Sequence, residues 1–428
     1  MWLVGGAVRD PLLGKPEPND FDLVTDRDAL ELARLLHSKG VSSIAPVLYP
    51  RFGTALVRVE GSNVEIVTAR KESYEAGSRK PDVEPASLLD DAKRRDFTVN
   101  ALLKNLHSGE LLDPLGCAVA DLESRVLRTP LEPAATFRDD PLRMLRAVRF
   151  RWQLGFEPAE GLYEAIRAER ERLRIISGER IREELVRMLG LPDAHRCLKD
   201  LMDLGLLEIF APELCSMPGV EQGSYHHLDV WDHTLVVLRE AGTGDLTLSL
   251  AALLHDVGKP QTRAVDDKGQ IRFFGHESAG AEIAERILRR LKFPNELVLP
   301  VVRLVKNHMR LTGVPKFTDS AARRLLRDLG EDSGRLIDLI EADGKGLKRG
   351  VKTLDLNLVR ERLEEVAREK PETGFDSPLT GDEIKEFLNL EEGPEVGRLK
   401  SLLAEKVLEG ELSPEDKEGA KRALLELD

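Results

Sequence analysis

The chain has little cysteine, few aromatic residues and no excess of positive charge. Its three cysteines, Cys117, Cys197 and Cys215, are too few and too widely spaced for a disulfide framework or a cysteine-rich zinc site. With 5% aromatic residues and a net charge of −13, it is not a generally basic, base-stacking nucleic-acid binder. No apolar run approaches the ~20 residues that span a bilayer. Because the first residues also lack the pattern of a secretory signal, we expect a cytoplasmic protein without membrane partners.

The hydrophobic pattern differs between the start and the remainder of this chain of 428 residues. Four short β-rich runs lie near its start, at residues 2–4, 20–24, 54–59 and 63–67. Amphipathic segments dominate the rest, including residues 141–154, 178–189, 246–254 and 279–291. These patterns predict a small unit of alternating strands and helices first and a mostly helical, all-α body after it, which is an α+β fold overall. We also expect a mobile loop over residues 75–86 and a linker over residues 371–378, because both are rich in residues that favour turns.

The first candidate site combines a glycine pair with two aspartates. Gly5 and Gly6 follow a short apolar run, where a strand-to-helix turn would let backbone N–H groups approach a phosphate. Asp20 and Asp22 lie in a β-type run, so their side chains project from the same face. Two such carboxylates suit Mg²⁺, which binds acids together with substrate phosphates. A solvated edge strand is the alternative, but the preceding glycine pair favours a site for nucleotidyl transfer.

These residues resemble the start of the class II tRNA nucleotidyltransferases. That family comprises CCA-adding enzymes and bacterial poly(A) polymerases, within the polymerase-beta nucleotidyltransferase superfamily. Further stretches match it in order: Arg94–Ala101, Asp113-Pro114 with Gly116, Asp139–Phe150 and, more weakly, Glu179–Ile181 with Glu184. Asp139 stands where family members often carry Glu, which is a minor departure. The resemblance implies a polymerase-beta-like head made of a mixed sheet plus helices.

The resemblance also implies the roles of individual residues. Asp20 and Asp22 would be catalytic and would hold Mg²⁺. A larger set of residues would bind the nucleotide: Gly5, Gly6, Arg9, Arg95, Asp96, Asp140, Arg143 and Arg146. The first three of them would contact its triphosphate. Arg94 is a less certain neighbour of this set. Glu65 is either a third acid of the site or an ordinary strand-edge residue.

Asp140 and Arg143 are the most informative of these residues. On a helix, residues i and i+3 share a face. A carboxylate accepts from an exocyclic amino group and an arginine donates to a ring nitrogen or carbonyl, so the pair matches cytosine and adenine. In the family such a pair replaces a nucleic-acid template. A surface ion pair is the alternative. The stretch from Lys71 to Pro81 lies where the family has a flexible loop for switching from C to A addition, which disfavours a CC-only enzyme.

A second candidate site is indicated by clustered histidines. Six of the chain's 9 histidines fall within one segment: His226, His227, His233, His255, His276 and His308. His255 and Asp256 follow an apolar helical run and should emerge together from the end of that helix. Imidazole and carboxylate ligands suit Mn²⁺, Fe²⁺, Co²⁺, Ni²⁺ or Zn²⁺, with Mg²⁺ at carboxylate-rich sites.

This segment resembles an HD-domain phosphohydrolase. The resemblance implies that His233, His255, Asp256 and Asp343 bind a first metal, while His276 and His308 complete a second metal site or bind phosphate. The metal would be Mn²⁺, Ni²⁺, Co²⁺ or Mg²⁺, and the site would activate water to attack a phosphate ester. The alternative is a degenerate domain that serves as a helical scaffold.

The two resemblances together predict a division of the chain and a reaction. We expect a catalytic head over residues 1–125, a base-recognising helical neck over 126–190, an HD-containing body over 191–350 and a tRNA-binding tail over 351–428. The enzyme would add CMP and AMP, as CCA or as the terminal A alone, to the tRNA 3′ end from CTP and ATP, releasing pyrophosphate. The alternatives are a poly(A) polymerase, a phosphohydrolase with a regulatory nucleotide-binding head, and a non-catalytic RNA-binding protein.

Binding of tRNA would rest on local basic stretches. They comprise the arginines of 138–151; Arg286, Arg289, Arg290 and Lys292; Arg323, Arg324 and Arg327; and Lys345, Lys348, Arg349 and Lys352. Such residues could contact phosphates of the tRNA acceptor and T arm despite the acidic total, because phosphate contacts need placed cations rather than a basic whole. Solvated helix faces are the alternative for at least half of them.

Overall fold

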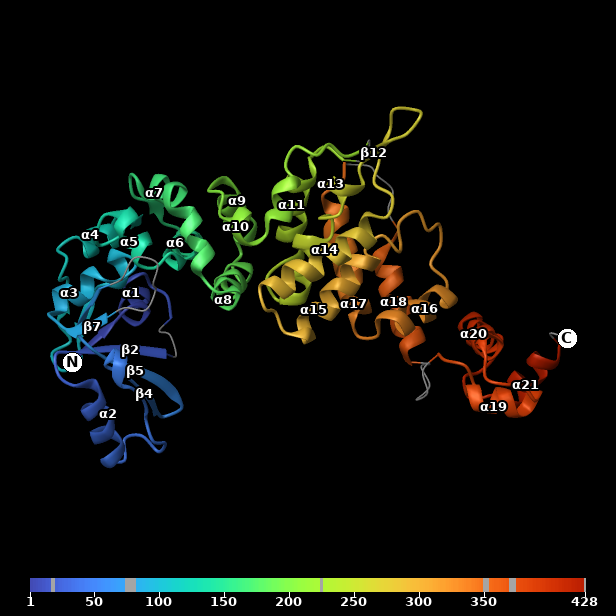
Figure 1. Ribbon diagram of the computed structural model, residues 1–428, viewed down its shortest axis with the longest axis horizontal. Coiled ribbons are helices and arrows are strands. Elements are labelled where there is room, and N and C mark those ends of the chain that lie inside the picture. Colours follow the sequence, from blue (N-terminus) through green and yellow to red (C-terminus); the bar gives the residue numbers. More distant parts are fainter. Residues whose placement is uncertain (17–19, 74–81, 224–225, 349–353, 369–374, 427–428) are drawn as a thin grey trace. The chain divides into compact units, whose positions relative to one another are not determined.

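A seven-stranded mixed sheet lies at the start of the chain in the computed structural model (Figure 1). Its strand order is β3-β4-β5-β2-β1-β8-β9. The strands are β1 (Trp2–Val4), β2 (Asp20–Thr25), β3 (Val47–Tyr49), β4 (Thr54–Val59), β5 (Ser62–Thr68), β8 (Leu103–Asn105) and β9 (Leu111–Leu112). Strands β2 and β5 are parallel, and the other neighbours are antiparallel. The structure describes residues 1–16, 20–73, 82–223, 226–348, 354–368 and 375–426.

Helix α2 (Ala29–Ser38) covers one face of this sheet. The Asp28 side chain caps it by accepting from the backbone N–H of Leu30 at 2.7 Å, which satisfies a donor that has no partner inside the helix. Ala29 and Ala33 pack against buried sheet residues, including Ile66. The four predicted strands are confirmed, since strands lie at residues 2–4, 20–25, 54–59 and 62–68.

One loop prediction needs correction. Strand β7 (Asp82–Pro85) pairs antiparallel with β6 (Arg70–Ser73). The expectation of a loop over residues 75–86 is therefore wrong for residues 82–85, because backbone pairing outweighs their turn-favouring composition. Residues 74–81, which hold most of the predicted loop, lie outside the described residues.

Further helices, some between the strands and the rest after them, complete the first of two units. They are α1 (Gly6–Leu12), α3 (Leu88–Lys93), α4 (Ala118–Glu123), α5 (Pro133–Asp139), α6 (Leu142–Leu154), α7 (Leu162–Glu169), α8 (Gly178–Leu189), α9 (Ala194–Asp203) and α10 (Leu207–Phe210). Two short strands, β10 (Val126–Leu127) and β11 (Glu157–Pro158), pair in parallel beside them. The unit comprises Met1–Cys215 with Arg290–Lys292. Helix α6 is largely buried within it and ends at Gly155, whose left-handed conformation favours glycine.

The second unit comprises Ser216–Arg289 and Phe293–Asp428. Its helices are α11 (Val230–Ala241), α12 (Leu246–Leu254), α13 (Lys259–Thr262), α14 (His276–Arg290), α15 (Asn295–Asn307), α16 (Asp319–Leu329), α17 (Asp332–Lys345), α18 (Leu356–Arg368), α19 (Gly381–Leu388), α20 (Pro394–Glu409) and α21 (Lys417–Leu425). A hairpin of β12 (Ala264–Val265) and β13 (Ile271–Arg272) interrupts them. The predicted α+β fold with a helical body is confirmed.

Helix α12 lies at the centre of this unit. Every residue from Thr247 to Leu254 is buried, and the helix packs against α11, α15 and α17. An almost wholly apolar helix is stable only in such surroundings. Helices α19, α20 and α21 have a core of their own, which includes Ile384, Leu403 and Ala420. Among the described residues, no helix is both long enough and apolar enough to cross a bilayer.

Candidate active sites

Strand register gathers three acidic side chains in the first unit. Asp22 on β2 pairs in register with Glu65 on β5 and with Val4 on β1, which directly precedes Gly5. Asp20 lies two residues earlier on β2 and therefore on the same face as Asp22. Strand β5 lies between β4 and β2, so Glu65 is not on an edge strand. The arrangement favours Glu65 as the third acid of the site.

The three carboxylates influence one another's protonation. The pKa of Asp22 is raised, first because surrounding protein displaces water from its carboxylate and then because Asp20 repels it; Arg95 opposes this. The pKa of Glu65 is raised by the same loss of water and by repulsion from Asp22. A divalent cation would relieve this repulsion. The oxygen-only donor set fits Mg²⁺, which Asp20 and Asp22 would hold.

The glycine turn lies directly against this acidic cluster. Gly5 has a φ of 72° and precedes the first turn of α1, a backbone conformation that favours glycine. A Cβ atom on Gly5 would lie 3.4 Å from Oδ2 of Asp22. Gly6 begins the helix, beside the side chains of Arg9 and Asp10. Backbone N–H groups and carboxylates therefore occur side by side, as a site for a metal-bound phosphate requires.

Arg9 is held inside the first unit by several partners. Its Nε donates to Asp10 Oδ1 at 2.7 Å, and its Nη1 donates to the side chain of Asn100. Its guanidinium carbon lies 5.1 Å from the ring centroid of Phe150. Arg9 is 4% exposed. Its predicted contact with the triphosphate stays a prediction, and the observed bonds support the fold beneath the glycine turn.

Asp91 fixes the two neighbouring arginines of the Arg94–Ala101 motif. The Nη2 atoms of Arg94 and Arg95 lie 2.6 Å and 3.0 Å from its two carboxylate oxygens. Burial alone would raise the pKa of Asp91, but the two guanidiniums lower it overall. The arginines are therefore not a solvated basic turn. Sequence reasoning missed Asp91, although its i, i+3 and i, i+4 spacing to the arginines was a usable signal.

Asp96 binds Arg146 rather than facing open solvent. Nε and Nη2 of Arg146 lie 2.8 Å and 2.5 Å from Asp96 Oδ2, and Asn100 donates to Oδ1 at 2.9 Å. Burial alone would raise the pKa of Asp96, but Arg146 and these bonds hold it well below its usual range. Asp96 is thus placed to orient Arg146. Nucleotide binding by either residue stays a prediction.

The expectation that Asp140 and Arg143 share a helix face is wrong. Helix α6 begins at Leu142, and Asp140 has extended backbone dihedrals, with φ −136° and ψ 101°. The physical reason is Pro141, since a residue before proline is disfavoured in the α conformation. The Asp140 carboxylate accepts from Arg180 at 3.0 Å. Arg143 is nearly buried and donates to the backbone carbonyl of Arg94 at 2.5 Å.

These partners explain the weaker motif at residues 179–184. Arg180 orients Asp140, and buried Glu184 accepts from Arg149 at 2.6 Å. Among the described residues, no ion pair joins Asp140 to Arg143, so the surface ion-pair alternative does not describe them. Both side chains are held from elsewhere in the unit. Base recognition by this pair stays a prediction.

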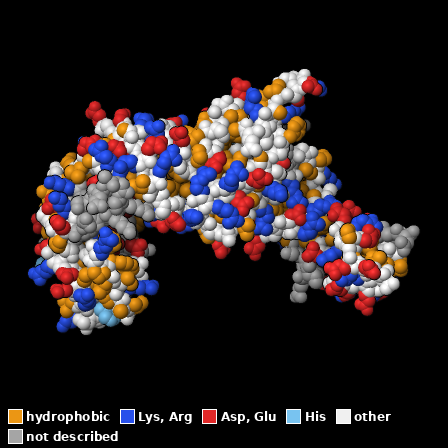
Figure 2. Space-filling model, in the orientation of Figure 1, with side chains coloured by type: hydrophobic (Ala, Val, Ile, Leu, Met, Phe, Trp, Pro, Cys, Tyr) orange, Lys and Arg blue, Asp and Glu red, His pale blue; other side chains and the backbone are white. Residues whose placement is uncertain are grey.

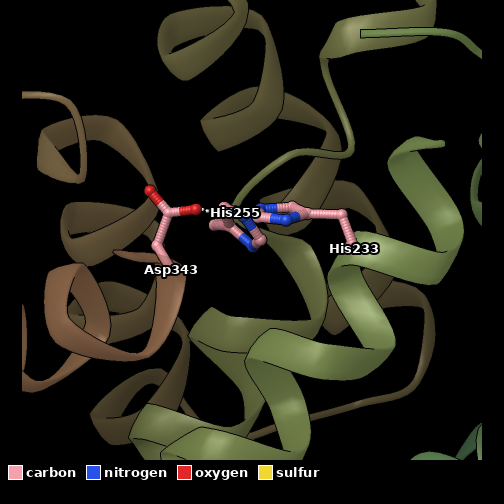
Figure 3. Close-up of side chains that lie close together, drawn as sticks. All are labelled: His233, His255 and Asp343. Carbon is pink, nitrogen blue, oxygen red and sulfur yellow. Dashed lines mark hydrogen bonds and ion pairs between the residues drawn. The ribbon is translucent and has the colours of Figure 1, made fainter. Parts of the chain in front are cut away.

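Three predicted metal ligands of the second site converge, as Figure 3 shows. His233 comes from α11, His255 directly follows α12 and Asp343 comes from α17. Nε2 of His233 lies 2.8 Å from Asp343 Oδ1, and Nε2 of His255 lies 3.9 Å from the same oxygen. The nitrogen–oxygen donor set fits a divalent transition metal.

The other three predicted residues form a second, adjoining group. His276, His308 and Asp256 each offer one ligand atom, all within 4.8 Å of one another. Asp256 belongs to both groups by its position: Oδ2 lies 3.1 Å from Nε2 of His255, and Oδ1 lies 3.5 Å from Nε2 of His276. A carboxylate between two histidine groups suits two metal ions. Asp256, predicted to bind the first metal, thus lies between the two groups of candidate ligands.

Backbone carbonyls orient three of these imidazoles. Nδ1 of His255, His276 and His308 lies 2.8, 2.8 and 2.7 Å from the carbonyl oxygen three residues earlier. A carbonyl can only accept, so each Nδ1 carries a hydrogen, and in the neutral form of each ring Nε2 has a lone pair. Those Nε2 atoms face the cluster, which is the tautomer that metal binding requires.

Burial keeps two of the histidines neutral. It lowers the pKa of His276, and it lowers that of His308 to about 4, with help from His255. The pKa of His255 is raised instead, because Asp256 more than offsets the effect of burial. Asp256 itself is held well below its usual pKa despite burial, mainly by His255 and Lys259. An ionised aspartate beside the neutral imidazoles of His276 and His308 is a ready metal-binding group.

Lys259 is a residue of this site that sequence reasoning missed. Its Nζ lies 2.6 Å from Asp256 Oδ2 and 2.6 Å from Gln222 Oε1. The side chain is buried, which is rare for lysine unless it is paired. The signal was its position three residues after Asp256, just beyond a glycine turn. Lys259 thus holds Oδ2 of the Asp256 carboxylate in place.

Two glycines let the backbone approach these ligands closely. A Cβ on Gly346 would overlap the ring of His233, and one on Gly258 would lie 2.6 Å from the backbone nitrogen of Gly280 in α14. The turn after His255 therefore packs directly on the helix that carries His276. Larger residues at either position would displace a ligand-bearing element.

Many arginines of the basic stretches form ion pairs with acidic residues of the same chain. Arg324 pairs with Glu405 and Glu409, and Arg289 pairs with Glu285 at 2.8 Å. Figure 2 shows basic and acidic side chains interleaved over the visible face. Arg349 and Lys352 lie outside the described residues. A tRNA path along these stretches stays a prediction.

Three protein-family models match successive parts of the chain. A model described as the poly A polymerase head domain matches residues 1–128. One described as the "Probable RNA and SrmB- binding site of polymerase A" matches residues 155–217, and the HD domain model matches residues 223–346. The first contains the acidic cluster with its glycine turn, and the third contains all six histidine and aspartate residues that are predicted to bind metal.

Curated relatives and solved structures agree with these matches. The chain is 37% identical over 426 residues to an A-adding tRNA nucleotidyltransferase of Deinococcus radiodurans, covering 96% of this chain and 92% of the relative. It is 37% identical over 440 residues to a CC-adding enzyme of Thermus thermophilus, with coverage of 99% and 92%. The CCA-adding enzyme of Bacillus stearothermophilus in complex with CTP superimposes with a TM-score of 0.71, at 25% identity and 99% and 92% coverage.

The fold and first site define a nucleotidyltransferase head joined to an HD domain, two classes whose chemistry depends on divalent metals. The chain belongs to the tRNA nucleotidyltransferase family, and it is an enzyme.

Proposed function

We propose that this chain transfers nucleotides from CTP and ATP to the 3′ end of tRNA. The observation that carries the proposal is the register that places Asp22 beside Glu65 and against the Gly5 turn. Asp20 and Asp22 would hold Mg²⁺, which when bound neutralises phosphate charge and favours the deprotonated hydroxyl. That the acceptor is tRNA is supported by the names of the relatives, both of which are tRNA nucleotidyltransferases.

The reaction balances without a further reactant. The 3′ oxygen of tRNA forms a bond to the α-phosphorus of the nucleotide, and the bond from that phosphorus to the oxygen bridging to the β-phosphate breaks. Pyrophosphate leaves, and the proton of the hydroxyl passes to solvent. The N–H groups around Gly5 and Gly6 would bind the triphosphate, while Asp140 and Arg143 would select the base by its Watson–Crick edge.

The set of nucleotides added is decided by one assay. The protein is incubated with tRNAs ending before CCA, after one C and after CC, each with single labelled nucleotides. Full CCA synthesis, CC addition alone, A addition alone and long A-tails are distinct products, the last supporting the poly(A) polymerase alternative. No incorporation on any acceptor with Mg²⁺ contradicts the proposal.

A second activity is favoured by the six-ligand cluster in the HD domain. We propose that it hydrolyses a phosphate ester on Mn²⁺, Ni²⁺, Co²⁺ or Mg²⁺. A water oxygen forms a bond to phosphorus, the ester bond breaks, and a water proton passes to the leaving alkoxide. The intact ligand set argues against a degenerate scaffold. Assays of phosphate mono- and diesters across these metals test it, and no hydrolysis with any of them contradicts it.

Some finer expectations remain part of this proposal. They are the division at residues 125, 190 and 350, contact with the tRNA acceptor and T arm, and a cytoplasmic location. The identity of each metal is also proposed on the donor chemistry alone. Metal analysis of the protein after dialysis against each ion tests it at both sites.

A further inference from the structure

A cavity lies in the first unit, at the end of the sheet away from the acidic cluster. Its volume is about 330 Å³, within the range of small-molecule sites. Its walls are the start of α2, the 3₁₀ turn Pro50–Phe52 and the hairpin of β6 and β7. Asp22 and Glu65 pair three residues before Thr25 and Thr68, so the cavity begins about 10 Å beyond them along the strands. None of the site residues predicted from the sequence lines it.

The cavity follows the carboxyl ends of the two parallel strands. Strand β2 ends at Thr25 and β5 ends at Thr68, and the segments that leave both strands contribute residues to the lining. In α/β sheets, ligands commonly bind outside the carboxyl ends of parallel strands, because the segments that leave the strands diverge there and form a crevice. The position of the cavity in the fold is therefore one that favours a ligand.

Hydrogen bonds brace the walls of the cavity. Thr68 Oγ1 accepts from the backbone N–H of Ala29 at 3.0 Å and donates to the carbonyl oxygen of Arg27 at 3.2 Å. Nη1 of Arg70 donates to the carbonyl oxygen of Phe52. These bonds hold the turn after β2 and the turn before β4 to strands β5 and β6, so the cavity is formed without a ligand.

The charges that line the cavity favour an anion. Its lining includes three arginines, Arg27, Arg51 and Arg70, and two aspartates, Asp26 and Asp28. Asp28 is already bound to backbone N–H groups as the cap of α2. Arg27 and Arg51 are exposed, and among the described residues neither forms an ion pair. Two guanidiniums are thus available to a phosphate, which arginine binds through two parallel hydrogen bonds.

The rest of the lining is largely apolar and includes an aromatic ring. Leu30, Pro50 and Pro85 line the cavity together with Phe52. Phe52 is half-buried, and its ring centroid lies 5.9 Å from the guanidinium carbon of Arg51. An aromatic ring beside arginines is the combination on which proteins bind a nucleotide, because the base stacks on the ring and the phosphate pairs with the cations.

We propose that this cavity is a second nucleotide site, separate from the acidic cluster, in which the base lies on Phe52 and the phosphate binds Arg27 and Arg51. The same unit of base, ribose and phosphate occurs in free nucleotides and in unpaired RNA. Stacking on an aromatic ring tolerates any base, since every base has a π-face. The site goes beyond the proposed nucleotidyl transfer, whose reacting nucleotide lies at the acidic cluster.

Photo-crosslinking to the full-length protein locates the site. The protein is irradiated with 8-azidoadenosine 5′-phosphate, and labelled peptides are identified by mass spectrometry. Label should appear on peptides that contain residues 26–30 or 50–53 and should be displaced by AMP. Ribose 5-phosphate, which has no base, should displace it at least about fivefold less effectively. Label confined to other parts of the chain, or displacement by inorganic phosphate as effective as by AMP, overturns the inference.

Substitutions in the lining test the two halves of the nucleotide separately. Arg27→Glu and Arg51→Glu should each raise the AMP concentration needed for displacement at least about tenfold, because each loses a charged hydrogen bond. Phe52→Leu keeps an apolar side chain without the stacking surface; it should weaken AMP about 5- to 150-fold and ribose 5-phosphate by less than about twofold. Arg34→Glu reverses an exposed charge on α2 outside the cavity and should change neither.

The source of the nucleotide is decided by a second competitor. A short single-stranded oligoadenylate that displaces the label at least about tenfold better than AMP identifies unpaired RNA, whereas a weaker or equal effect identifies free nucleotides. Circular dichroism verifies the folding of each variant. If the folded variants Arg27→Glu and Arg51→Glu both bind AMP at these peptides as the unaltered protein does, the cavity is not a nucleotide site.

Discussion

Oδ2 of Asp96 accepts hydrogen bonds from both Nε and Nη2 of Arg146, at 2.8 and 2.5 Å. The bond ties the Arg94–Ala101 motif to helix α6 within the first unit. Asp96→Ala removes the nearer of the two carboxylates beside Arg146 and leaves only Glu184, at 3.7 Å. Since breaking a buried ion pair is costly, the substitution should lower the free energy of unfolding by about 3 kcal/mol. Urea unfolding measures this. Glu171→Ala, in an exposed pair with Arg174, is the matched control and should cost under about 1 kcal/mol.

The same carboxylate should make stability depend on pH. Its pKa is lowered in the folded state, so the stabilisation is fully present above the unfolded value of about 3.9 and is lost as pH falls below it. Asp96→Asn has no such proton to bind. Between pH 6 and about pH 3, the unaltered protein should therefore lose more unfolding free energy than Asp96→Asn; equal losses would show that Asp96 is not held ionised.

Asp140→Asn should relax the choice of base. The variant keeps the shape of the side chain but loses the charge that accepts from an exocyclic amino group and pairs with Arg180. Misincorporation of UMP and GMP should rise at least about tenfold relative to CMP and AMP, since a lost charged bond is worth about 1.5–3 kcal/mol. Glu171→Gln is the control. Unchanged selectivity in single-nucleotide assays would remove Asp140 from base recognition.

A pair of glycines tests the HD cluster without altering a ligand. Gly346→Ala would place a methyl group on the ring of His233, whereas Gly344→Ala in the same region meets nothing within 4 Å. We expect Gly346→Ala to lose metal-dependent phosphohydrolase activity and bound metal, with nucleotidyl transfer kept. Metal content by mass spectrometry provides the direct readout. Retention of full metal content by Gly346→Ala would mean that His233 is not a ligand.

Local patterns in the sequence predicted the elements well. Strand β4 at 54–59 and helix α8 at 178–189 match their predicted bounds, because alternation and helical periodicity record one-sided burial. The sequence pattern suggested a helix through Asp140, but Pro141 disfavours the α conformation of the residue before it, and Asp140 is extended in the structure. Residues 82–85 were misplaced because their strand partner had to be known first.

The parts of the sites that could not be predicted depend on pairing between distant residues. The sequence leaves the role of Glu65 open, because its place beside Asp22 follows from the parallel pairing of β2 and β5, which composition does not reveal. The six HD ligands were predictable as residue types and by resemblance. That Asp256 lies between two groups, with Lys259 on its Oδ2 atom, depends on the packing of α12 against α17 and of the turn at Gly258 against α14.

In the proposed function, nucleotidyl transfer to tRNA depends on Mg²⁺ held by Asp20 and Asp22. The most direct measurement is incorporation of labelled CMP and AMP into tRNA lacking its 3′ end, by the unaltered protein, Asp20→Asn and Asp22→Asn, with circular dichroism to verify folding. We predict addition by the unaltered protein in the presence of Mg²⁺. Each folded variant should be slowed at least about a thousandfold, because it loses the charge that holds the metal. Folded variants that retain incorporation near the unaltered rate would contradict the account.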